Sequence, residues 1–297
     1  MGSKFADRLT ALVEERRSQV CLGLDPDPAK LLPGIAVGSE GAGPPAVRAG
    51  RAVAAHCREL IARVGPHCVA VKPQLACFER LGPPGWEALA EARRAAREAG
   101  LIFLADGKRG DVPVTAAAYA QVLVGSTPTP WGEVEGLGAD AFTANPLLGR
   151  DALEPLVAGC AAAGAGMFVL VRTSNPGAAD LMDLPAPTAP LHERLAALVD
   201  GLSDRLLGDG GLSGLGAVVG ATEPEHIARL RELMPRSIFL LPGVGAQGGD
   251  PALLGAAFGP GPAAALVSSS RGIAGADDPA AAAEELRATL WANSANA

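Results

Sequence analysis

Short, continuous runs of apolar residues alternate along the chain with longer amphipathic stretches. Such runs indicate parallel strands buried on both faces, because a strand with one face in water would alternate apolar and polar residues. The sequence predicts eight of them, at 19–25, 68–72, 101–106, 140–144, 166–172, 215–220, 237–241 and 263–268. Helices are predicted between them, over 46–64, 85–99, 114–124, 190–206, 223–234 and 279–292.

This strand–helix rhythm predicts an α/β fold, a (β/α)₈ TIM barrel forming a single domain over 1–297. A doubly wound open sheet is the competing arrangement, since periodicity does not show whether a sheet closes. Segments 33–45 and 125–139 interrupt the rhythm and are predicted to be loop insertions. The first 20 residues predict a charged amphipathic helix rather than a signal peptide.

Composition excludes several classes of protein. The net charge is −7 with no basic run, which disfavours nucleic-acid binding. Every apolar run is shorter than the roughly 18 residues of a membrane span. The five cysteines contain no Cys-x-x-Cys pair, so neither a disulfide framework nor a zinc site is expected, and we predict a reduced, cytoplasmic protein with no bound metal.

Two of only four lysines, Lys72 and Lys108, lie at the C-terminal ends of predicted strands, where a barrel places its active site. In segment 101–115 (LIFLADGKRGDVPVT), Asp106 and Lys108 are two apart and should project together from an extended chain. With Asp111 they form an acid–lysine–acid pattern that can keep the lysine protonated. The alternative is a plain salt bridge, with Asp111 capping the following helix.

The first two predicted strands end in charged residues at the same rim. Lys72 ends CVAVK and Asp25 ends QVCLGLD. Both can belong to the site formed by Asp106 and Lys108. The alternatives are a surface lysine that extends its amine to water and an aspartate in a turn.

Segment 240–250 (LLPGVGAQGGD) contains glycines in G-x-G-x-x-G spacing after a strand. A dinucleotide site fits poorly because Asp250 and a proline follow at once and no acid ends the next strand. We interpret the segment as a phosphate loop, with exposed backbone N–H groups and the Gln247 amide as donors. Arg271, after the eighth strand, suits the same phosphate. The alternative is a mobile glycine loop.

Polar residues also follow the fifth strand, in RTSNPGA. Thr173, Ser174 and Asn175 offer neutral donors and acceptors that suit the amide edge of a heterocycle. A Pro-Gly turn explains the same residues without any ligand.

In this order, these elements resemble the orotidine 5′-phosphate decarboxylase family. Its signature Asp-x-Lys-x-x-Asp is matched by Asp106, Lys108 and Asp111, and VKPQ, TANPLLG, TSNPGA, PGVGAQGGD and SSSRGI are similar to the longer bacterial subfamily. The resemblance spans about 19–273 and leaves 125–139 unassigned. It implies decarboxylation of orotidine 5′-monophosphate to uridine 5′-monophosphate, the last step of UMP biosynthesis, without cofactor or metal.

The resemblance also implies roles for the charged residues. Lys108 would donate a proton to C6 of the pyrimidine. Asp106 and Asp111 would hold the lysine array near the substrate carboxylate. Lys72 and Asp25 would contact the ribose hydroxyls.

By the same resemblance, Ser174 would bind the pyrimidine amide, and Gln247 and Arg271 would grip the phosphate. A homodimer is implied, with Asp111 and Thr115 serving the neighbour's site. Three other functions remain open: a metal-dependent sugar-phosphate decarboxylase or aldolase, a dinucleotide-dependent oxidoreductase, and a non-catalytic phosphate-binding barrel.

Overall fold

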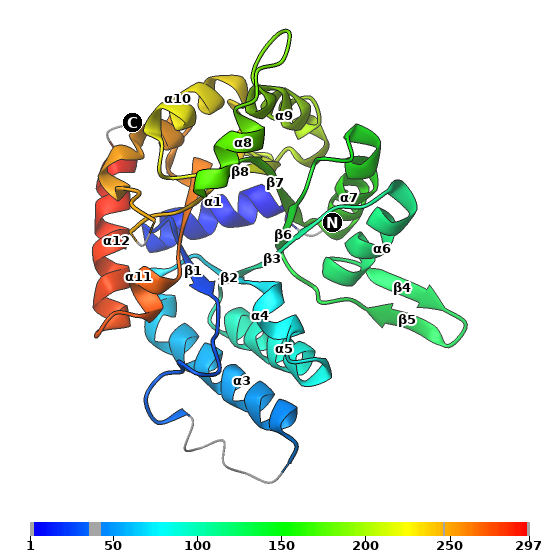
Figure 1. The fold of residues 1–297 in the computed structure, drawn as a ribbon, viewed down its shortest axis with the longest axis vertical. Coiled ribbons are helices and arrows are strands. Elements are labelled where there is room, and N and C mark those ends of the chain that lie inside the picture. The colour runs from blue at the N-terminus through cyan, green and yellow to red at the C-terminus, as the bar shows by residue number, and fades with distance from the viewer. Residues whose placement is uncertain (1–2, 36–42, 246, 296–297) are drawn as a thin grey trace.

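The computed structural model describes residues 3–35, 43–245 and 247–295. At its centre eight parallel strands form a closed barrel, in the order β1, β10, β9, β8, β7, β6, β3, β2 (Figure 1). All eight predicted strands are confirmed, and the open sheet is wrong because β1 pairs with both β2 and β10. The strands are β1 (Val20–Leu24), β2 (Ala70–Pro73), β3 (Ile102–Arg109), β6 (Ala141–Ala144), β7 (Gly166–Arg172), β8 (Ser213–Val219), β9 (Ser237–Pro242) and β10 (Ala265–Ser269).

Helices surround the barrel and connect its strands. The six predicted ones are confirmed, although 190–206 divides after Asp200 into the α-helix α9 (Leu191–Asp200) and the short 3₁₀ helix η3 (Ser203–Leu206). The α-helices after α1 are α3 (Pro45–Val64), α4 (Leu75–Glu79), α5 (Pro83–Glu98), α6 (Pro113–Leu123), α7 (Arg150–Ala163), α8 (Ala179–Met182), α9 (Leu191–Asp200), α10 (Pro224–Leu233), α11 (Arg271–Ala274) and α12 (Pro279–Ser294). Short 3₁₀ helices are η1 (Gly65–His67), η2 (Pro176–Ala178), η3 (Ser203–Leu206), η4 (Pro251–Leu253), η5 (Gly255–Phe258) and η6 (Pro262–Ala264).

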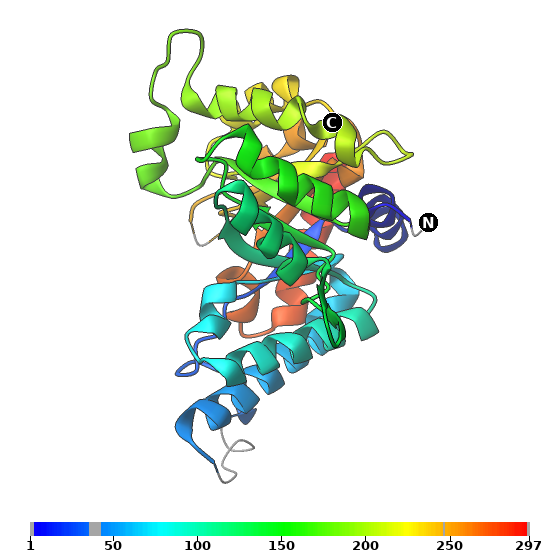
Figure 2. The same cartoon turned by 90° about the vertical axis from the view of Figure 1, so that its right-hand side faces the viewer.

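The predicted N-terminal helix is α1 (Phe5–Arg16), and it closes one end of the barrel. Its buried face packs against the inward side chains of the strands, and the ring of Phe5 meets that of Phe168 edge-on at 6.0 Å. Figure 2 shows α1 at one end and the segment around α8 at the other. The site must therefore open at the carboxyl ends of the strands.

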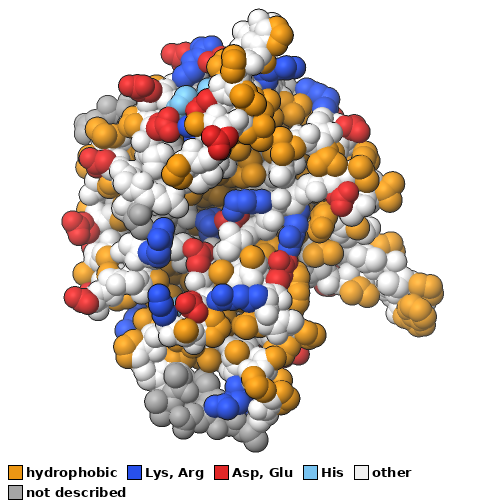
Figure 3. Space-filling view, in the orientation of Figure 1, with side chains coloured by type: hydrophobic (Ala, Val, Ile, Leu, Met, Phe, Trp, Pro, Cys, Tyr) orange, Lys and Arg blue, Asp and Glu red, His pale blue; other side chains and the backbone are white. Residues whose placement is uncertain are grey.

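The 125–139 insertion folds into an antiparallel hairpin of β4 (Ser126–Thr129) and β5 (Gly132–Glu135). It projects from the barrel and carries hydrophobic side chains at its tip (Figure 3), where Trp131 is 93% exposed. Of the other predicted insertion, 36–42 lies outside the described residues. No helix in the described ranges is long and apolar enough to cross a bilayer.

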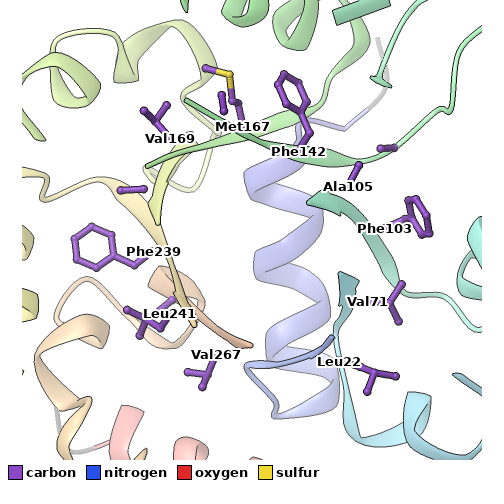
Figure 4. Packing of buried hydrophobic residues seen from close by; sticks show 14 of the residues in the cluster. Leu22, Val71, Phe103, Ala105, Phe142, Met167, Val169, Phe239, Leu241 and Val267 are labelled. Carbon is purple, nitrogen blue, oxygen red and sulfur yellow. The ribbon is translucent and has the colours of Figure 1, made fainter. Parts of the chain in front are cut away.

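The main core lies between the strands and the outer helices. Outward-facing side chains such as Leu22, Phe103 and Met167 point away from the barrel axis into this layer (Figure 4). Because inward positions are packed separately against α1, each strand is buried on both faces, which explains its continuous apolar sequence.

Candidate active site

A cavity of about 480 Å³ opens at the carboxyl ends of the barrel strands. Charged side chains gather over the middle of this face (Figure 3). All nine predicted site residues lie in the described part of the chain. Seven of them line the cavity: Asp25, Lys72, Asp106, Lys108, Ser174, Gln247 and Arg271.

Asp106 is the centre of the charged cluster and is 4% exposed. Its Oδ2 accepts a hydrogen bond from Lys72 Nζ at 2.6 Å, and its Oδ1 accepts one from Lys108 Nζ at 2.7 Å. Thr143 of β6 donates to the same Oδ1 at 2.8 Å. Both oxygens are therefore engaged by cations, as a buried carboxylate requires.

The local backbone explains how one short segment directs both Asp106 and Lys108 to this point. The pairing of β3 with β6 shifts register between Ala105 and Arg109, and Lys108 has a φ of 48°. The predicted convergence of Asp106 and Lys108 is confirmed. The predicted extended geometry is wrong, because the left-handed turn at Lys108 brings its amine back to Asp106.

Burial and opposite charge act against each other on the pKa values of Asp106 and Lys72. Burial disfavours the charged form of Asp106, but Lys72 and Lys108 more than offset it and hold its pKa below the usual range. Burial likewise acts against the Lys72 ammonium, and Asp106 and Asp25 outweigh it, so the pKa of Lys72 is raised. Asp106 and Lys72 therefore stay ionised around neutral pH.

Glycines let the loop after β7 approach the cavity. A Cβ on Gly220 would stand 2.8 Å from the Cα of Ser174, and one on Gly243, whose φ is 109°, would stand 2.9 Å from its Cβ. Those contacts are shorter than real side chains allow. Ser174 can therefore line the cavity because both neighbouring loops lack side chains at these points.

The loop after β9 differs in one respect from its sequence interpretation. The amides of Gly245, Gly248 and Gly249 donate to carbonyls inside the loop. The expectation that its glycine amides would be available to an anion is wrong for these three. Gln247 and Arg271 are exposed and line the same cavity, so their side chains remain as donors.

Asp111 and Thr115 do not line the cavity. Asp111 is half-buried and accepts a hydrogen bond from the amide of Val112, while Thr115 is exposed on α6. The helix-cap alternative for Asp111 is wrong, because the N-cap residue of α6 is Val112. Within one chain, these two residues therefore do not join the other seven predicted site residues in the cavity lining.

Sequence reasoning gave no role to two polar residues beside Asp106. Gln74 bridges to Asp106 in the sheet and its amide lies 3.4 Å from Oδ2, and Thr143 is almost completely buried. Both lie in segments that carried the resemblance, VKPQ and TANPLLG. The sequence did offer one sign of a role for Thr143, since it is a polar residue inside an otherwise apolar strand. Among the described residues, no three His, Cys, Asp or Glu side chains form a group that could hold a metal ion.

The fold and the site together define a (β/α)₈-barrel protein whose charged groups meet where the strands end. A family model described as Orotidine 5′-phosphate decarboxylase / HUMPS family matches residues 18–286. The chain therefore belongs to that family, as its sequence motifs indicated.

Individual relatives agree with this assignment. A Rhodopirellula baltica protein named orotidine 5′-phosphate decarboxylase is 43% identical over 272 residues, 91% of this chain and 87% of that one. The solved Leishmania donovani OMP decarboxylase is 33% identical with a TM-score of 0.76, over 99% of this chain and 100% of that one. The Leishmania donovani UMP synthase structure is 34% identical with a TM-score of 0.78, over 99% of this chain and 57% of that longer one.

Proposed function

We propose that the protein is a carboxy-lyase that converts orotidine 5′-monophosphate to uridine 5′-monophosphate and CO₂ as the last step of UMP biosynthesis. The observation that carries the proposal is the pairing of Lys72 and Lys108 with the two oxygens of buried Asp106 at a nucleotide-sized cavity. The family supports the same reaction.

In this reaction the bond between C6 and the carboxylate breaks, CO₂ leaves, and the electron pair stays on C6. Lys108 supplies the ammonium that stabilises this charge and then gives C6 its proton. Its side chain is 42% exposed, whereas that of Lys72 is 8% exposed, so Lys108 is assigned to the reacting carbon and Lys72 to the ribose. A fixed ammonium needs little reorganisation as the charge develops.

The other predicted residues bind substrate in this proposal. Asp25 and Lys72 contact the ribose hydroxyls, and Ser174 contacts the pyrimidine amide. Gln247 and Arg271 hold the phosphate, whose binding energy helps to close the site and exclude water.

The proposal includes a homodimer in the cytoplasm. Asp111 and Thr115 lie outside the cavity of their own chain, which supports their contribution to a partner's site. Asp111 would then complete the lysine–aspartate array near the substrate carboxylate. Five free cysteines, four of them buried, support a reducing compartment.

The test is loss of orotidine 5′-monophosphate absorbance with purified protein in EDTA, beside Lys108→Ala. We expect turnover without added metal or cofactor and a loss of at least about 10³-fold in the variant, since a group that acts in the transition state is removed. Circular dichroism and the melting temperature should stay near wild type, because the Lys108 side chain is partly in water.

Other outcomes would point to the competing functions. A folded wild-type protein without turnover in EDTA rejects the proposal, and activity on sugar phosphates after adding magnesium would support the metal-dependent alternative. Binding of NAD(H) would support an oxidoreductase, and binding of nucleotide without turnover would indicate a non-catalytic barrel.

A further inference from the structure

Thr143 occupies an unusual position in the barrel. It is the polar residue of β6, it is 1% exposed, and it borders the cavity from the strand next to β3. Buried hydroxyls in strands need a partner, and this one has two. It donates to Asp106 and accepts from the backbone of Lys108.

The hydrogen bond that Thr143 accepts from the Lys108 amide lies where the pairing of β3 with β6 is interrupted. Ala105 pairs with Phe142 and Arg109 pairs with Ala144, so three residues of β3 stand opposite Thr143 alone. Thr143 Oγ1 accepts from the Lys108 amide at 2.9 Å, in place of a backbone carbonyl. This contact anchors the bulge at the residue that adopts the left-handed conformation, which costs energy for a side chain other than glycine.

The donor contact ties the same hydroxyl to the carboxylate. Oδ1 of Asp106 accepts from Thr143 at 2.8 Å and from the Lys108 amine at 2.7 Å. The Thr143 hydroxyl therefore binds the backbone amide of Lys108. It also binds Oδ1 of Asp106, the same oxygen that the Lys108 amine binds. Serine could make both bonds, whereas valine has the shape of threonine without either.

We propose that Thr143 is a positioning residue that sets the location of the Lys108 amine relative to Asp106. It acts through those two groups, so its effect belongs to the chemical step rather than to substrate binding. The inference rests on the proposed decarboxylation.

The experiment compares the steady-state decarboxylation kinetics of wild type, Thr143→Val and Thr143→Ser. We expect Thr143→Val to lower kcat by about 10–100-fold, as loss of a charge-assisted hydrogen bond does, with KM changed by less than about threefold. Thr143→Ser should keep kcat within about threefold of wild type, because it retains the hydroxyl. Thr10→Val, which removes a hydroxyl that donates to a carbonyl in α1, is the matched control.

Each result decides between distinct possibilities. If Thr143→Val keeps the wild-type kcat, or if Thr143→Ser loses as much as Thr143→Val while both melt cooperatively, the positioning role is wrong. If Thr143→Val does not fold, Thr143→Ala replaces it with the same expectation and the same criteria. If folded wild type shows no turnover, the proposed function fails, and the role of Thr143 fails with it.

Discussion

At the residue scale, two lysines share one carboxylate but have different surroundings. Lys72 is enclosed between Asp106 and the barrel interior, where Cys21 is also buried and burial raises the pKa of its thiol to about 12. The Lys108 side chain is partly exposed to the cavity. Both lysines bind Asp106, and the more exposed Lys108 is the better placed of the two to approach the reacting atoms of a ligand.

The direction of the pKa shifts predicts how this cluster depends on pH. The pKa of Asp106 is lower in the folded chain, so its stabilisation is present above the ordinary carboxyl value near pH 4 and is lost as pH falls through the lower folded value. The pKa of Lys72 is raised, so its stabilisation persists to about pH 10.5 and is lost above it.

Urea unfolding from pH 8 to pH 2.5 checks the acid side. The free energy of unfolding of wild type should fall more steeply below about pH 4 than that of Asp106→Asn, because the variant has lost this titrating group. The contributions of the other carboxylates cancel in the comparison. Parallel curves for the two proteins would contradict the low pKa of Asp106.

At the scale of elements, one arginine connects two loops beside the cavity. Arg172, at the end of β7, donates from Nε and Nη2 to Asp183 at 2.8 and 2.9 Å and from Nη2 to Glu223 at 3.0 Å. Asp183 follows α8, and Glu223 precedes α10. Because Ser174 lies in the loop that ends at α9, this ion network restrains a segment that lines the cavity.

Breaking one side of the network should affect substrate binding. Asp183→Asn loses one charged partner of Arg172, so we expect KM for orotidine 5′-monophosphate to rise about 3–10-fold with a smaller change in kcat. Asp180→Asn, which changes an exposed aspartate of α8, is the control and should leave both constants near wild type. Equal KM values for the two variants would show that the network does not shape the cavity.

At the scale of the whole molecule, the start of α6 exposes apolar side chains to solvent and does not line the cavity. Val112 and Val114 are 52% and 85% exposed. The turn before them packs tightly on the loop after β6, since a Cβ on Gly110 would stand 2.6 Å from the carbonyl oxygen of Asn145. That loop also exposes Leu147. Apolar side chains grouped in this way indicate a protein interface, which fits the proposed dimer.

Mixed dimers test whether Asp111 serves the partner's site. Lys108→Ala and Asp111→Asn should each be nearly inactive. If Asp111 acts across the interface, a mixed dimer has one site with both defects and one intact site, so random mixing restores about a quarter of wild-type activity. Each variant remixed with itself is the control. An unrestored mixture, with mixed dimers demonstrated by mass spectrometry, would place both residues in the same site.

The continuous apolar runs predicted eight strands, and the polar and charged residues that follow them, together with the family resemblance, predicted seven residues of one cavity. A parallel strand buried on both faces has to be apolar throughout, and its polar residues collect where it ends. Lys72 and Asp106 are separated by 34 positions, yet both could be assigned to one rim by this rule. The bulge at Lys108 could not be predicted, because it arises from the register between β3 and β6.

By itself, then, the sequence determined the strand–helix order, the family and the identity of the charged groups, since these depend on local pattern and motif. Closure of the sheet, the hairpin in 125–139 and the two bonds of Thr143 were decided by the tertiary structure. Each depends on which segments become neighbours, and β1 meets β10 across more than 200 residues of chain. The tertiary structure also keeps Asp111 and Thr115 out of the cavity lining, because the start of α6 faces solvent in the single chain.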